Sequence, residues 1–190
     1  MSIDWTTELL LQLSWHWENH LRPRMSGLTD EEYRWEPVQG CWSVRPRAEA
    51  TTPMAVGAGD WLLDFALPEP EPAPVTTIAW RICHLLVGVF GSRNASHFGG
   101  PPTDYRGYDY PAHAQDALDQ LDEMYDRWTA GVRGLTPEQL AQPCGEFGFE
   151  NSTMAALVLH IHREVIHHGA EIALLRDLYV WQEGTKGGIV

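Results

Sequence analysis

The segment His160-Ile-His-Arg-Glu-Val-Ile-His-His-Gly-Ala-Glu-Ile-Ala-Leu-Leu-Arg176 decides the fold that we expect. At 100° per residue, the apolar side chains in and just before it fall within one arc, roughly 60° to 140° from His160. These side chains are Leu157, Ile161, Val165, Ile172 and Leu175. The pattern predicts a long amphipathic helix with one face in a hydrophobic core.

Two polar side chains lie on the apolar side of this helix. Glu164 falls at about 40° and His168 at about 80°, so the i,i+4 spacing points both of them toward the core. Burying a carboxylate and an imidazole costs free energy unless a partner compensates them. A divalent metal ion would do so. A hydrogen-bonded Glu164–His168 pair without metal is the alternative.

The rest of the chain predicts three more long helices. The first covers residues 4 to about 24 with Asp4 as N-cap, and a short helix follows Thr29. The second covers residues 77 to about 97 after Thr76 as N-cap, and the third begins at Pro111 and closes at Gly134. The last begins after Asn151 or Ser152 and ends near Tyr179. The predicted fold class is all-α, a four-helix bundle in one domain of residues 1–190.

A long crossover joins the first two helices. Residues 34–75 are rich in proline and glycine without a clean period, and residues 68–74 read as an extended linker. The segment also carries several large aromatic side chains: Trp35, Trp42, Trp61 and Phe65. We expect an irregular segment that packs over the bundle as a lid or as the wall of a cleft. The loop 103–110, rich in tyrosine, is expected on the surface.

Composition limits the function classes. The formal net charge is −13 and the pI is near 5.0, which argues against nucleic acid or an anionic membrane as partner. The N-terminus lacks the pattern of a signal peptide, and no apolar run approaches the ~18 residues of a transmembrane helix. Cys41, Cys83 and Cys144 are odd in number and lack CxxC spacing. We therefore expect a cytoplasmic protein.

A third candidate ligand stands on the second long helix. His84 lies close to the apolar face formed by Ile82 and Leu85. Together with Glu164 and His168 it would form a set of two imidazoles and one carboxylate, which leaves coordination positions open for water or substrate. An open site of this kind favours catalysis over a structural role. The residues do not discriminate among zinc, nickel, iron and manganese.

Three motifs resemble the DinB/YfiT-like superfamily over nearly the whole chain. They are Trp80-Arg-Ile-Cys-His84-Leu, Glu164-Val-Ile-His-His168 followed by Leu174-Leu-Arg176, and Trp15-His-Trp-Glu-Asn-His-Leu-Arg-Pro-Arg with Gly27-Leu-Thr-Asp-Glu-Glu-Tyr. The resemblance implies an up-down-down-up bundle, often dimeric, with a metal held by the residues at positions 84, 164 and 168. The carboxylate at 164 is similar to that of mycothiol-dependent isomerases.

Other residues could belong to the same site. If the motif is aligned one residue earlier, His167 takes the place of His168 as the candidate ligand. The residue four positions before His167 is Arg163, which cannot ligate a metal. His160 stands four residues before Glu164 and could support it or replace it. His16 and His20 on the first helix are a rival pair, more readily explained as a pair at a cavity edge. Arg176 either anchors a substrate group or makes a surface ion pair, and Cys83 is expected to be packing.

The resemblance implies an activity with a small thiol. We expect a metal-dependent S-transferase or isomerase in detoxification or stress response, with mycothiol or bacillithiol and an electrophile as partners, and a homodimer. A metal-dependent hydrolase is one alternative. A non-catalytic, dimeric bundle with a structural metal is the other.

Overall fold

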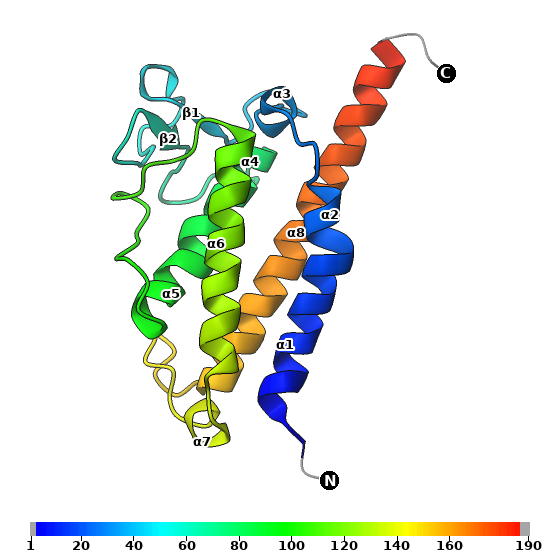
Figure 1. The fold of residues 1–190 in the computed structure, drawn as a ribbon. Coiled ribbons are helices and arrows are strands. Elements are labelled where there is room, and N and C mark those ends of the chain that lie inside the picture. The colour runs from blue at the N-terminus through cyan, green and yellow to red at the C-terminus, as the bar shows by residue number, and fades with distance from the viewer. Residues whose placement is uncertain (1–2, 187–190) are drawn as a thin grey trace.

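Four long helical stretches run side by side in the computed structural model, which describes residues 3–186 (Figure 1). The first consists of α1 (Trp5–His16), the π-helical segment η1 (Trp17–Leu21) and α2 (Arg22–Arg24). The second consists of α4 (Ile78–His84), the π-helical segment η3 (Leu85–Gly91) and α5 (Ser92–His97). The others are α6 (Ala114–Arg133) and α8 (Met154–Lys186). The short helices are α3 (Asp30–Tyr33), η2 (Arg47–Glu49) and α7 (Pro137–Leu140).

The order of directions along the chain is up, down, down, up. In Figure 1, α1 and α8 rise while the α4–α5 stretch and α6 descend. α1 packs against α6 and α8, and the α4–α5 stretch packs against the same two helices. The predicted all-α four-helix bundle is therefore confirmed.

Two predicted N-caps are present. Asp4 Oδ1 accepts a hydrogen bond from the amide of Thr7 at 3.2 Å, and Thr29 Oγ1 accepts one from the amide of Glu32 at 3.2 Å. Each cap satisfies an amide that has no partner in the first helical turn.

Four predicted helix boundaries are wrong. Thr77, not Thr76, caps α4, because its Oγ1 accepts from the amide of Trp80 at 3.2 Å. α6 begins at Ala114 instead of Pro111, since the Ala114 amide is bound by the side chain of Asp30 at 2.8 Å. Thr153 Oγ1 accepts from the amide of Ala156 at the start of α8, which continues past position 179 to Lys186.

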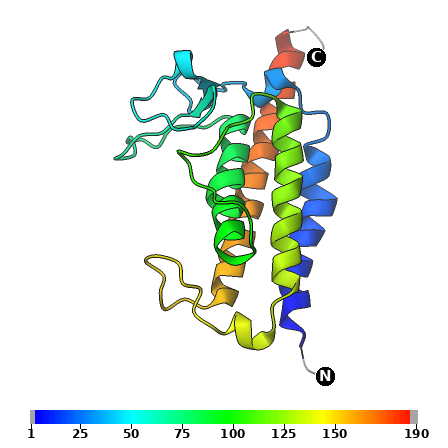
Figure 2. The same ribbon diagram turned by 60° about the vertical axis from the view of Figure 1, so that its left-hand side comes forward.

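The crossover is more regular than expected. Strands β1 (Val44–Pro46) and β2 (Trp61–Leu63) pair antiparallel, with Val44 opposite Leu63. Both of these side chains are buried, so the small sheet is held by its contact with the bundle. The expectation that the segment packs over the bundle is confirmed, since the Trp42 ring lies 6.1 Å from that of Trp80 on α4. Figure 2 shows the crossover projecting from one side of the bundle.

Aromatic side chains fill the core between the helices. The rings of Trp17 and Tyr125 stack with 4.0 Å between centroids, which joins the first helical stretch to α6. Trp128 is fully buried, and the ring of Phe98 meets it edge-on at 5.3 Å. These contacts join α6 to the first and second helical stretches.

Within the part of the chain that the structure describes, no helix has the length and apolarity needed to cross a membrane.

Candidate metal centre

His84 is held in one orientation at the end of α4. Its Nδ1 lies 2.7 Å from the hydroxyl of Tyr105, and its ring stacks on Trp80 with 5.3 Å between centroids. Burial, followed by the charges of His168, Arg81 and Arg93, lowers the pKa of His84 to about 3. The imidazole is therefore neutral near pH 7, which is the form that binds a metal ion.

His168 is held by a carboxylate on its own helix. Its Nδ1 lies 2.7 Å from Oε2 of Glu171, which also pairs with Nε of Arg81 at 3.1 Å. A carboxylate accepts a hydrogen bond from Nδ1–H, and in the neutral ring this leaves the lone pair on Nε2. Nε2 lies 3.6 Å from Oε2 of Glu164. Burial is the main cause that lowers the pKa of His168.

The fold brings the two histidines together across the bundle. The rings of His84 and His168 lie 4.8 Å apart between centroids and meet edge-on at 89°. Glu164 and His84 line the same cavity of about 410 Å³, which is bounded by η3, α8 and the loop that carries Tyr105. The three residues predicted as ligands therefore meet at one place.

The donor types, two imidazoles and one carboxylate, are ones that divalent metal ions prefer. Each histidine uses Nδ1 for an oxygen partner and has Nε2 left, the arrangement that commonly orients histidine ligands. Two ligand atoms on one tetrahedral zinc ion are about 3.4 Å apart, given bond lengths of about 2.1 Å. The 3.6 Å between His168 Nε2 and Glu164 Oε2 is close to that spacing.

A more closely spaced group of possible ligands shares His168 but does not include His84 or Glu164. Within the described residues, His167, His168 and Glu171 offer ligand atoms that all lie within 4.8 Å of one another. The guanidinium of Arg81 lies 3.1 Å from Glu171 and 3.5 Å from Nδ1 of His168. The positive charge of Arg81 is therefore already next to these two groups. Repulsion between that charge and a metal ion favours the set on the Nε2 side of His168.

The remaining candidates lie around or away from this centre. His160 Nδ1 accepts from Nη2 of Arg163 at 2.6 Å, and the same nitrogen lies 3.4 Å from Oε1 of Glu164. His167 is exposed and lies 3.5 Å from Glu171. His16 and His20 stack on each other on the first helical stretch, and neither is among the described residues that line the cavity of His84.

Arg176 has a carboxylate partner within the protein. Its Nε and Nη2 donate to the two oxygens of Glu32 at 2.5 and 2.9 Å, and its Nη1 donates to backbone carbonyls of Arg24 and Ser26. These bonds occupy the guanidinium of Arg176 within the protein.

Several functional residues escaped the sequence analysis. Tyr105 belongs to the loop 103–110, which lies on the surface as expected, with Asp104, Arg106 and Asp109 exposed, but Tyr105 contacts His84 and Tyr110 is buried. Gly88 makes room for that contact, since a Cβ there would lie 2.0 Å from the Tyr105 hydroxyl. The i,i+3 spacing of His168 and Glu171 was a signal that could have identified the carboxylate partner.

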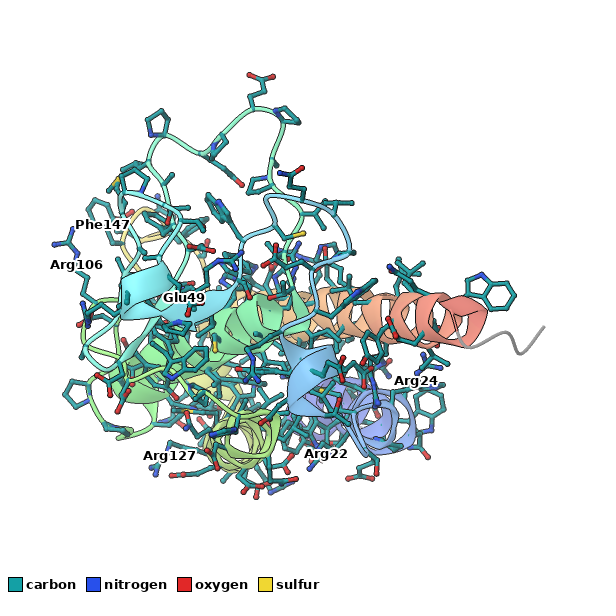
Figure 3. The ribbon with its side chains drawn as sticks, turned by 90° about the horizontal axis from the view of Figure 1, so that it is seen from above. Arg22, Arg24, Glu49, Arg106, Arg127 and Phe147 are labelled. Atoms are coloured by element: carbon teal, nitrogen blue, oxygen red, sulfur yellow. The ribbon has the colours of Figure 1, made fainter. Side chains whose placement is uncertain are left out.

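The crossover reaches the centre through aromatic contacts. Phe65 contacts Trp42, which contacts Trp80, and Trp80 stacks on His84. The crossover also lines a cavity of about 540 Å³ that includes Tyr105 and Arg106. Figure 3 shows Arg106 on the same side of the bundle as Phe147, a residue of the loop 143–153. The expectation of a cleft wall therefore has a structural basis.

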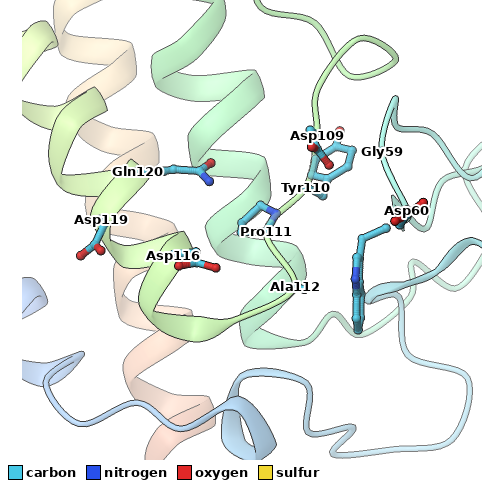
Figure 4. A pocket seen from close by; sticks show the side chains of 10 residues that line it. Gly59, Asp60, Asp109, Tyr110, Pro111, Ala112, Asp116, Asp119 and Gln120 are labelled. Atoms are coloured by element: carbon cyan, nitrogen blue, oxygen red, sulfur yellow. The ribbon is translucent and has the colours of Figure 1, made fainter.

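A separate cavity carries no candidate ligand. It measures about 610 Å³, lies between the crossover and the start of α6, and is lined by acidic side chains (Figure 4). These are Asp60, Asp109, Asp116 and Asp119.

The cysteines do not face the candidate centre. Cys83 is fully buried with its Sγ 3.6 Å from the hydroxyl of Tyr33, so the expectation that it is a packing residue is confirmed. Burial raises the pKa of its thiol to about 12. Cys41 and Cys144 are also buried.

Comparison with known proteins points to one family. The family model described as the DinB superfamily matches residues 12–172. This region contains all the proposed ligands. Comparisons with curated proteins and with solved structures found no match.

Proposed function

The chain belongs to the DinB superfamily, and from this premise we propose that it is a metal-dependent enzyme that transfers or isomerises substrates with a small external thiol. The observation that carries the proposal is the meeting of two neutral imidazoles, those of His84 and His168, beside Glu164 at a cavity of about 410 Å³. Three ligands leave positions for a fourth group.

A divalent metal bound by these residues would lower the pKa of a thiol and hold the thiolate beside an electrophile. The chain's own residues prepare the site. Tyr105 fixes the ring of His84, and the Arg81–Glu171 pair fixes that of His168. In a transfer, sulfur bonds to the electrophilic carbon, the leaving group departs with its electron pair, and the thiol proton is released to solvent.

The protein's own cysteines support an external thiol. All three are buried, and burial raises the pKa of Cys41 and Cys83. A thiol with a raised pKa and no access to solvent is a poor nucleophile. The nucleophile must therefore enter the cavity from outside. Mycothiol and bacillithiol are the thiols to test first, and a homodimer remains a prediction.

The proposal is tested by supplying metal-loaded protein with each thiol and a chromogenic aryl halide. We expect turnover only when both thiol and metal are present. The His84→Ala variant should show no turnover. Arg127→Gln is a matched control, because this α6 residue pairs with Glu123 at 3.8 Å on a different side of the bundle from Phe147 (Figure 3).

Two results would contradict the proposal. One is no turnover above the metal-free protein with any thiol. The other is metal-dependent cleavage of an aryl ester without thiol, which would favour the hydrolase alternative.

A further inference from the structure

A smaller cavity adjoins the candidate metal centre. It measures about 280 Å³ and is lined by residues of α5, the loop 143–153 and α8. It shares Arg93 and His160 with the cavity that contains His84 and Glu164. A molecule in the smaller cavity would therefore lie beside the candidate centre. Figure 2 shows the loop 143–153 projecting from the same side of the bundle as the crossover.

Apolar side chains form much of this cavity. Leu157 and Cys144 are buried against it, and Ala156 and Phe149 complete the apolar lining. The thiol of Cys144 donates to the carbonyl of Phe149 at 3.6 Å, which holds the loop residue in place. Since drug-sized ligands fill pockets of about 300–1,000 Å³, this cavity suits a small molecule with an apolar body.

Two guanidinium groups lie at the same cavity, opposed by one carboxylate. Arg93 comes from α5, Arg163 from α8 and Glu146 from the loop. This excess of positive charge stands in a chain with a net charge of −13. Arg163 is largely exposed, and its Nη2 lies 3.5 Å from Glu164 and donates to His160 at 2.6 Å, which places its guanidinium beside the cavity.

Arg93 keeps hydrogen-bonding capacity. Its Nη1 donates to the carbonyl of Gly88 and to Oγ of Ser92, and its Nη2 lies 3.4 Å from Glu146. Its Nε is buried without a hydrogen-bond partner among the described residues. A buried donor without a partner is destabilising, and an anionic ligand beside the guanidinium would offset that cost.

His160 adds a third donor. Its Nδ1 accepts from Nη2 of Arg163 at 2.6 Å, so in the neutral ring the proton is on Nε2. Two guanidinium groups and an N–H donor around an apolar cavity recognise a carboxylate on a small hydrophobic body.

We propose that this cavity binds small aromatic or branched aliphatic carboxylic acids, with the carboxylate on Arg93 and Arg163 and the apolar body against Leu157 and Phe149. Binding of the acid needs only these residues. The assignment of the acid as the electrophilic substrate rests on the proposed function, because the cavity adjoins the site at which the thiol would react.

The test compares phenylacetate with its neutral isostere phenylacetamide by titration calorimetry, on metal-loaded and metal-free protein. We expect the acid to bind at least tenfold more tightly than the amide in both forms. Arg93→Gln and Arg163→Gln should each weaken binding of the acid about fivefold or more and leave the amide unchanged. Arg127→Gln should leave both unchanged.

If Arg93→Gln fails to fold, Arg163→Gln still tests the inference, because Arg163 is exposed and its substitution should leave the fold intact. Equal affinities for acid and amide, or wild-type binding in the Arg163→Gln variant, would overturn the inference. So would binding of the acid that requires the metal, because the carboxylate would then be a metal ligand. Binding by metal-free protein that shows no thiol turnover would support the cavity assignment and contradict only the proposed function.

Discussion

The imidazole of His84 meets that of His168 edge-on, with 4.8 Å between their centroids. The two residues come from α4 and α8, and each ring has its Nδ1 on an oxygen, that of Tyr105 for His84 and that of Glu171 for His168. Because both Nδ1 atoms are occupied, the two Nε2 atoms remain as ligands.

The contact between Tyr105 and His84 depends on Gly88. A Cβ at position 88 would lie 2.0 Å from the Tyr105 hydroxyl, so Gly88→Ala must displace the tyrosine from His84. We expect the variant to bind metal about 10- to 100-fold more weakly, as when an outer partner of a ligand is lost. Tyr105→Phe should show a similar loss. Competition with a chromogenic chelator measures both.

Gly134→Ala is the matched control for this change. Gly134 has a φ of −79°, and the nearest atom to an added Cβ is 3.5 Å away, so alanine fits. The variant should bind metal as the wild type does. Wild-type affinity in both Gly88→Ala and Tyr105→Phe would show that Tyr105 does not position His84.

Arg176 joins α8 to α3 through a buried ion pair. Glu32 is almost fully buried and accepts from two nitrogens of Arg176. Breaking such a pair leaves a buried charge without a partner, so Arg176→Ala should lower the free energy of unfolding by about 3 kcal/mol or more. Urea denaturation measures the loss.

The exposed pair of Arg24 and Asp177 is the control for this loss. Arg24→Ala should cost under about 1 kcal/mol. An Arg176→Ala variant as stable as the wild type, but with a raised KM, would restore the substrate role that the sequence suggested.

His162 makes stability depend on pH. Burial lowers the pKa of this α8 histidine to about 4, and its Nε2 has no partner among the described residues. In the unfolded chain the pKa is about 6.5, so the unfolded state binds the proton first as the pH falls. Stability contributed by the neutral ring is complete above about pH 6.5 and is lost as the pH falls toward 4, by up to about 3 kcal/mol.

The His162→Phe variant isolates this effect. Urea unfolding at pH 7.5 and at pH 5 should show a smaller loss of stability in the variant than in the wild type. Other buried histidines titrate in both proteins, so the difference between the two proteins reports on His162. Equal losses would mean that His162 is charged or solvated in the folded state.

Local patterns were enough to predict the helices and the faces on which the candidate ligands lie. The apolar arc of α8 fixed the face on which Glu164 and His168 lie, and the same argument applied to His84 on α4. Both arguments need only the helical period, which is a property of neighbouring residues.

Features that depend on distant parts of the chain escaped prediction. β1 and β2 form because Val44 pairs with Leu63 and both are buried against the bundle, and no local period signals that contact. The first turn of α6 is set by Asp30, 84 positions away from Ala114. Tyr105 reaches His84 only because Gly88 leaves space, which is a property of the packed structure.

The most direct measurement is the metal content of the purified protein by plasma mass spectrometry, beside four single variants. We predict about one ion per chain in the wild type, loss of the ion in His84→Ala, Glu164→Ala and His168→Ala, and retention in His167→Ala. His167 stands next to His168 but is exposed and belongs only to the alternative group with Glu171. Loss in His167→Ala with retention in His84→Ala would place the metal in that group. Absence of metal from the wild type after reloading would contradict the metal centre itself.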